Sequence, residues 1–187
     1  MKYLITGLPR SRTAWMAQFM PNCVHEPCMH MKRIEDIRTI YADHDGISDS
    51  GLGFWLDWIL REVRPRTVII ERDIQEVEES LMAMGLGLPA TNFCELLKRK
   101  LDEIQDRPLV MRVPFNALGN VRVMQRVWWH LLGPNVAFDE ERFEKMNAQR
   151  IEVNAEHIAQ AFAAEHTIVD QIMPFIRPKE TSCLHHG

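Results

Sequence analysis

Two arginines stand among hydroxyl residues near the start of the chain, in Gly7-Leu8-Pro9-Arg10-Ser11-Arg12-Thr13-Ala14-Trp15. This segment lies between Tyr3–Thr6, which predicts a strand, and Thr13–Phe19, which predicts a helix. A loop that opens a helix presents free backbone N–H groups and the positive end of the helix dipole, which suits a phosphate group. Arg10 adds a fixed cation that can contact two phosphate oxygens at once. The segment therefore predicts a phosphate-binding loop; an ordinary capped strand-to-helix turn is the alternative.

A second feature pairs an arginine with a serine. Arg72 follows Thr67–Glu71, a β-branched apolar run that predicts a buried strand, and Ser80 comes eight residues after Arg72. Ligands of α/β proteins bind at the carboxyl ends of parallel strands, where Arg72 is expected. Ser80 falls on the apolar face of a predicted helix, where a hydroxyl needs a partner. The alternative is that Ser80 bonds to its own helix and Arg72 pairs with a surface carboxylate.

Together these features resemble those of the P-loop sulfotransferases. The loop of that family reads roughly Pro-(Lys/Arg)-Ser-Gly-Thr-Thr-(Trp/Leu), and this chain matches it at Pro9, Arg10, Ser11, Thr13 and Trp15. Arg12 replaces the usual glycine and Ala14 the second threonine, and the loop is not a Walker A box. The family also carries an arginine and a serine spaced like Arg72 and Ser80. Weaker likeness, in Leu109–Asn116 and Trp129–Gly133, extends the resemblance over roughly residues 1–150.

The resemblance implies binding of 3′-phosphoadenosine 5′-phosphosulfate. Arg10 would hold the 5′-phosphosulfate with the loop hydroxyls and amides, Trp15 would lie near the adenine, and Arg72 would hold the 3′-phosphate. The implied cofactor-binding set is Arg10, Ser11, Arg12, Thr13, Ala14, Trp15, Arg72 and Ser80.

Sulfuryl transfer also needs a base for the acceptor group. Relatives such as the tyrosyl-protein sulfotransferases look similar around Asn22–His25, a possible second strand, and carry a glutamate near its end. This resemblance makes Glu26 the first candidate, although it could instead be a solvated loop carboxylate. His25 is the second, because strand alternation points it the other way, and His30 is the third. The implied catalytic residues are Glu26, Arg10 and His25.

The same segment has a competing interpretation as a metal site. Its thiol and imidazole groups are ligands that suit zinc; they are Cys23, His25, Cys28 and His30. Their spacing matches no usual zinc finger, so we expect no metal. Asp49 lies in a glycine-flanked loop nearby, where it either touches substrate or caps the helix expected at Gly53–Glu62, unless Ser50 caps it.

Composition narrows the class of protein. The chain has 187 residues, of which 46% are hydrophobic and 26% charged, with a net charge of −4. These values suit one globular α/β domain and give no sign of a nucleic-acid binder that works through bulk positive charge. We expect no membrane segment and no signal peptide, and hence a cytoplasmic protein whose four cysteines need not pair.

The pattern of elements predicts a fold that positions these residues. Short apolar runs alternate with amphipathic ones, which indicates a three-layer α/β P-loop fold with a parallel sheet of about four to five strands flanked by helices. Further strands are expected at Leu109–Val113 and, less clearly, at Ile47–Ser50. Further helices are expected at Met31–Tyr41, Asp73–Met84, Asn92–Ile104, Asn120–Leu132, Glu140–Ala148 and Ala155–Met173. Asp73, Asn92 and Asn120 are the predicted caps of three of them, and Gly133 is the predicted stop of the helix that begins at Asn120. A single domain over 1–175 and a tail over 176–187 complete this prediction.

These observations predict a sulfotransferase that moves a sulfuryl group to a hydroxyl or amine of a small-molecule or peptide acceptor. One alternative is a P-loop small-molecule kinase, in which Glu71 holds a metal ion. The other is a non-catalytic nucleotide-binding protein, because the family's late basic-glycine motif has no clear counterpart; Arg177 and Lys179 do not match it.

Overall fold

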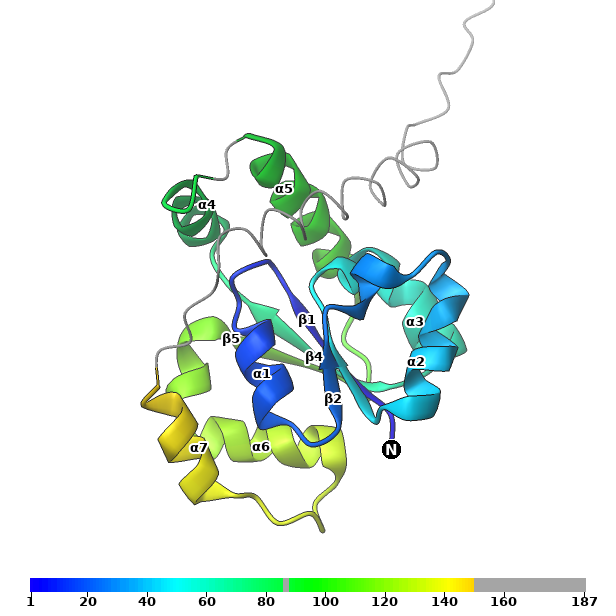
Figure 1. Ribbon diagram of the computed structural model, residues 1–187, viewed down its shortest axis with the longest axis vertical. Helices are drawn as coiled ribbons and strands as arrows, with labels where there is room; N and C mark the ends of the chain where they lie inside the picture. Colours follow the sequence, from blue (N-terminus) through cyan, green and yellow to red (C-terminus); the bar gives the residue numbers. More distant parts are fainter. Residues whose placement is uncertain (86–87, 150–187) are drawn as a thin grey trace, which may run out of the picture.

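A five-stranded parallel sheet forms the centre of the protein (Figure 1). The computed structural model describes residues 1–85 and 88–149; the helix predicted at Ala155–Met173 and the predicted tail lie outside them. The strands run in the order β2-β3-β1-β4-β5. Their bounds are Tyr3–Gly7 (β1), Cys23–His25 (β2), Gly46–Ser48 (β3), Arg66–Glu71 (β4) and Val110–Pro114 (β5). The predicted α/β fold, a parallel sheet of four to five strands flanked by helices, is confirmed.

The central strand β1 is buried along its whole length, because it pairs with β3 on one side and β4 on the other. Its neighbour β4 is equally buried over Thr67–Ile70, as expected for a strand covered on both faces. At the end of β1, Gly7 lies opposite Ile70, and a Cβ atom at Gly7 would come within 2.7 Å of the Ile70 carbonyl oxygen. A glycine here lets the two strands that carry the arginine loops approach closely.

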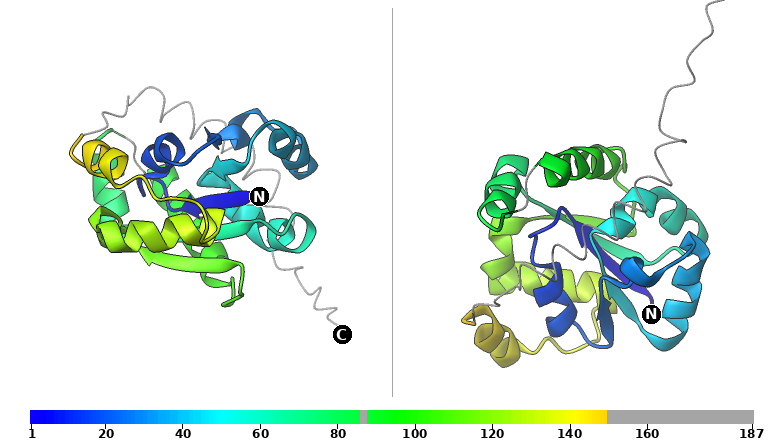
Figure 2. Two further views of the ribbon diagram at one scale, coloured as in Figure 1. Left: turned by 90° about the horizontal axis from the view of Figure 1, so that it is seen from below. Right: turned by 45° about the horizontal axis from the view of Figure 1, so that its top comes forward.

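Helices cover both faces of the sheet, and the left view of Figure 2 shows α1, α6 and α7 on the other side of the molecule from α2 and α3. The first group is Thr13–Phe19 (α1), Val121–Leu132 (α6) and Glu140–Asn147 (α7). The second is Ile37–Asp43 (α2), Leu56–Glu62 (α3), Ile74–Met82 (α4) and Leu88–Asp102 (α5), and it shares a separate hydrophobic core. Among the helices of residues 1–85 and 88–149, none is long and apolar enough to cross a membrane.

Local capping signals explain where several helices begin and end. The Asp73 carboxylate accepts the backbone N–H groups of Gln75 and Glu76, and the Asn120 side chain does the same for the first turn of α6. Gly133, with φ at 98°, ends α6 in a conformation that favours glycine. The predicted caps at Asp73 and Asn120 and the predicted stop at Gly133 are confirmed.

Other helix boundaries differ from the prediction. Helix α5 begins at Leu88, so the cap predicted at Asn92 is wrong. The helix expected at Met31–Tyr41 is a 3₁₀ turn at Ile34–Asp36 (η2) followed by α2, because the Asp36 carboxylate accepts backbone N–H groups just before that turn. The helix expected at Gly53–Glu62 also begins earlier, as the 3₁₀ turn Gly51–Trp55 (η3), and continues as α3.

Candidate functional site

Four loops meet at the edge of the sheet where the parallel strands end. Arg10 follows β1, Arg72 follows β4, Glu26 follows β2 and Asp49 follows β3. The helices after β1 and β4 pack in different cores, so these two loops leave the sheet towards opposite faces. A crevice between diverging loops at the carboxyl end of a parallel sheet is the usual ligand site of α/β folds.

Arg10, Arg72 and Ser80, which we call the basic cluster, come together from three separate segments. The Arg10 Nε–H group donates a hydrogen bond of 3.1 Å to Ser80 Oγ, and the Arg72 guanidinium donates to the Arg10 carbonyl oxygen. The Arg72 guanidinium also lies over the Phe115 ring, 4.1 Å from its centre, which holds the cation by a cation–π contact. The fold thus joins the two features that the sequence presents 62 residues apart.

The basic cluster carries positive charge with little compensation. Burial, and then the nearby Arg72 charge, lowers the pKa of Arg10 below its usual range. Within the described part of the chain, the one ion pair of these two arginines joins Arg72 to the exposed carboxylate of Glu76 at 3.5 Å. Such a surface pair contributes little. Two cations held this close favour an anionic ligand, and a bound phosphate would relieve their repulsion.

The loop between β1 and α1 has an alternating backbone conformation. Arg10 and Arg12 have φ values of 66° and 61°, in the left-handed region that favours glycine. The Arg12 side chain leaves the loop towards α7, where its guanidinium donates to Asn147 Oδ1 at 3.2 Å. Arg12 thus occupies a glycine-type conformation with its side chain anchored on another helix.

The other loop residues divide between the loop and the core. Ser11 is fully buried, and its hydroxyl has no hydrogen-bond partner among the described residues. Thr13 is buried at the start of α1, and its carbonyl oxygen accepts from Ser48 Oγ at 2.8 Å; Ala14 is half-buried. Trp15 packs between Phe19 and Phe143, and its indole N–H donates to the Met146 carbonyl at 3.1 Å. With Trp15 only 4% exposed, its ring offers little surface to a nucleotide.

Two carboxyl groups, one half-buried and one fully buried, lie at the ends of the neighbouring strands β2 and β3. We call Glu26 and Asp49 the acidic pair. Burial first, and then the negative charge of Asp49, raises the pKa of Glu26 to about 7. Burial raises the pKa of Asp49 to about 6, against the opposing effect of backbone N–H groups that favour its ionised form. Near neutral pH, Asp49 is therefore mostly ionised, and Glu26 can accept or release a proton.

His25 lies closer to Glu26 than strand alternation predicts. Its Nε2 atom is 3.5 Å from Glu26 Oε1. Glu26 has φ at 46° and has left the strand, because β2 ends at His25. The expectation that the two side chains point in opposite directions is therefore wrong: alternation holds only within an extended strand.

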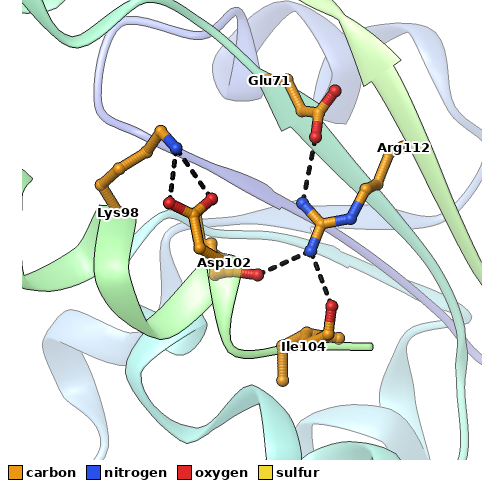
Figure 3. Close-up of polar contacts among 6 residues, drawn as sticks. Glu71, Lys98, Asp102, Ile104 and Arg112 are labelled. Atoms are coloured by element: carbon orange, nitrogen blue, oxygen red, sulfur yellow. Dashed lines mark hydrogen bonds and ion pairs between the residues drawn. The ribbon is translucent and has the colours of Figure 1, made fainter. Parts of the chain in front are cut away.

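Glu71, which would hold a metal ion in the kinase alternative, forms an ion pair with an arginine. Figure 3 shows Glu71 facing Arg112 of β5, and the Arg112 Nη1 atom donates a hydrogen bond of 3.0 Å to Glu71 Oε1. The other terminal nitrogen of Arg112 donates to the carbonyl oxygens of Leu101 and Ile104 at 2.7 and 2.8 Å. Arg112 thereby fixes the end of β4, directly before Arg72, to the end of α5.

The residues of the alternative zinc site do not gather. Among residues 1–85 and 88–149, no three His, Cys, Asp or Glu side chains are grouped so that they could hold a metal ion. Cys28 is buried in the core under α2 and α3, whereas His30 is exposed. Cys23 is half-buried, and burial raises its thiol pKa to about 12, which disfavours the thiolate that zinc requires.

Sequence reasoning missed three residues that shape the site: Phe115 under Arg72, Arg112 beside Glu71, and Asn147 beside Arg12. Phe115 directly follows β5, so its place at the carboxyl edge of the sheet is a signal that could have found it. Asn147 gives no such signal, because only the packing of α7 brings it to the loop. Comparison of the chain with protein-family models, curated proteins and solved structures gave no match.

Proposed function

We propose that this protein binds 3′-phosphoadenosine 5′-phosphosulfate and transfers its sulfuryl group to a hydroxyl or amine of a small-molecule or peptide acceptor. The observation that carries the proposal is the basic cluster. Arg10, Arg72 and Ser80 belong to two separate motifs that resemble those of P-loop sulfotransferases, and Arg10 is hydrogen-bonded to both of the others. A nucleotide with phosphates on both its 3′ and 5′ positions offers an anion to each motif.

Each group of the basic cluster has a distinct task in this proposal. Arg10, at the end of β1, neutralises the 5′-phosphosulfate, and the buried Ser11 hydroxyl gains the partner that it lacks in the described chain. Arg72, braced on Phe115, and Ser80 hold the 3′-phosphate. Because Arg10 and Ser80 already share a hydrogen bond, ligand binding exchanges that bond for charge-assisted bonds to phosphate oxygens.

The acidic pair supplies the base. An acceptor oxygen or nitrogen forms a bond to sulfur while the bond from sulfur to the bridging phosphate oxygen breaks. The acceptor proton passes to Glu26, and the electron pair of the broken bond stays on the leaving 3′,5′-diphosphoadenosine. Arg10 stabilises that developing charge. With its pKa near 7, Glu26 suits general base catalysis at neutral pH.

A reducing compartment such as the cytoplasm is the setting that we propose. Cys23 carries a free thiol, as is usual for proteins of a reducing compartment.

The first test is the thermal stability of the full chain with 3′,5′-diphosphoadenosine, ADP or ATP, each with and without Mg²⁺. A ligand that binds only the folded state adds about 2.7 kcal/mol at about 100 times its Kd. We expect this stabilisation from 3′,5′-diphosphoadenosine without Mg²⁺, and its loss in Arg72→Ala. Arg61→Ala is the matched control, because Arg61 is an exposed arginine near the end of α3, which leads to the opposite edge of the sheet.

The outcomes separate the candidate functions. Stabilisation by the 3′-phosphorylated nucleotide that survives Arg61→Ala but not Arg72→Ala supports the proposal and leads to an acceptor screen. Preference for ATP with Mg²⁺ would replace it with a kinase. Binding without turnover of any acceptor would favour the non-catalytic alternative.

A further inference from the structure

Asp49 occupies an unusual position for an acid, since its carboxyl group is completely buried beside a second acid. Its Oδ2 atom accepts the Cys28 backbone N–H at 2.8 Å, and its Oδ1 atom accepts the Leu52 backbone N–H at 3.0 Å. Cys28 belongs to the 3₁₀ turn Pro27–His30 (η1) after β2, and Leu52 belongs to η3 after β3. One carboxylate therefore ties together the loops that leave two neighbouring strands.

The turn that Asp49 holds is the one that carries Glu26. Glu26 is the residue directly before η1, and its backbone N–H donates to the Ser48 carbonyl oxygen at 3.0 Å. Its φ of 46° is unfavourable for a residue with a side chain, so this conformation needs support from its surroundings. Ser48 and Asp49 provide that support by accepting the backbone N–H groups of Glu26 and Cys28.

Asp49 also provides the negative charge next to Glu26. The neighbouring titratable side chains in the chain are the imidazole of His25, whose Nε2 atom lies 3.5 Å from Glu26 Oε1, and the thiol of Cys28, which is buried. Helix α1, which packs against β2, and strand β3 carry no titratable side chains. An ionised Asp49 therefore opposes ionisation of Glu26, and the backbone N–H groups around Asp49 keep that charge in place.

We infer that Asp49 is the positioning residue for Glu26: it fixes the turn that presents the base and holds a negative charge beside it. The inference rests on the proposed function, because it gives Asp49 its role through Glu26 as the base. Asp49 acts through Glu26 and is assigned no contact with the substrate.

The test is a titration of the Glu26 side-chain carboxyl carbon by ¹³C NMR in the full, nucleotide-free chain. We expect a midpoint near pH 7 in the unmodified protein and a midpoint lower by roughly one pH unit in Asp49→Asn, because the like charge is removed. Asp45→Asn is the matched control: Asp45 precedes the same strand β3 at its other end and is half exposed. A purely structural role would not produce a selective change at Glu26.

A second measurement covers the case in which Asp49→Asn does not fold. In the unmodified protein, the amide protons of Cys28 and Leu52 should shift together with the Asp49 titration and be protected from exchange, since both bond to its carboxylate. Amides that ignore this titration would overturn the inference, as would a folded Asp49→Asn with an unchanged Glu26 midpoint. Neither readout uses a nucleotide, so absence of nucleotide binding would instead overturn the proposed function.

Discussion

The basic cluster and the acidic pair lie at the same edge of one sheet but differ in how their charges are held. The side chains of Arg10 and Arg72 are half-buried and their charges repel each other; they bond to a serine hydroxyl, a carbonyl oxygen and the exposed carboxylate of Glu76. Asp49 is fully buried, and each oxygen of its carboxylate accepts a backbone N–H group, one from each of two loops. The basic cluster has donors left for a ligand, whereas the carboxylate of Asp49 is bonded within the protein.

This difference predicts which variants lose ligand affinity and which lose stability. Removing a side chain from the basic cluster should cost ligand affinity and little stability, because its present bonds are few and its charges are in conflict. Removing Asp49 should cost stability, because it leaves buried N–H groups without an acceptor. Glu26 lies between these cases, since its side chain is half-buried and its carboxyl group can exchange a proton near neutral pH.

The largest effect is expected for Asp49→Ala. The loss of the acceptor for the Cys28 and Leu52 N–H groups should lower the free energy of unfolding by about 3 kcal/mol. Urea denaturation measures this change. Asp45→Ala, at an exposed acid, should change it by less than about 0.5 kcal/mol. Equal losses of stability in the two variants would mean that the buried hydrogen bonds of Asp49 contribute no more than the contacts of Asp45.

The basic cluster should show the reverse behaviour. Arg10→Ala should weaken binding of 3′,5′-diphosphoadenosine by about 2 kcal/mol, the scale of hydrogen bonds to a charged partner. It should not destabilise the free protein, because burial and the Arg72 charge already disfavour the Arg10 cation. Calorimetric titration and urea denaturation together check both halves. A large loss of stability in the free protein would show that Arg10 is structural.

A pH-dependent effect is expected for Glu26→Gln. The pKa of Glu26 is about 7 in the folded protein, above its ordinary value of 4.5, so folding favours its protonated form. The unmodified protein therefore loses stability as pH rises from about 4.5 through about 7, while the glutamine variant lacks this loss. Relative to the unmodified protein, the free energy of unfolding of Glu26→Gln should rise by about 2 kcal/mol between pH 5 and pH 8. A difference independent of pH would mean that Glu26 titrates like an exposed carboxylate.

The smallest effect concerns the shape of the loop itself. Arg12 has φ at 61°, so glycine should be favoured over alanine at this position. Both Arg12→Gly and Arg12→Ala lose the bond to Asn147, and their difference isolates the backbone. We expect the glycine variant to be more stable by about 1 kcal/mol in thermal unfolding. Equal stability would mean that the loop relaxes once the anchor on α7 is lost.

Much of the molecule could be predicted from the sequence because its signals are local. Continuous apolar runs predicted β1 and β4, and the side chains of Asp73 and Asn120 marked the starts of α4 and α6. The residues of the basic cluster were also recognisable, because each stands in a loop after a strand or on a helix that follows one. Local signals failed at the start of α5, which begins at Leu88, before the cap predicted at Asn92. They also gave no hint of contacts that a distant residue makes, such as that of Asn147 with Arg12, 135 residues away in the chain.

By itself, the sequence determined the fold class, the position of the loop between β1 and α1 and the identity of the candidate charged residues, because these depend on neighbours within a few positions. Only the tertiary structure decided which of these residues meet. Arg10 reaches Ser80 because β1 and β4 pair, and Arg12 is anchored on Asn147 because α7 packs beside α1. The pKa values of Glu26 and Asp49 likewise arise from burial between strands that are far apart in the chain. Desolvation and charge proximity are properties of the folded arrangement, and no local pattern encodes them.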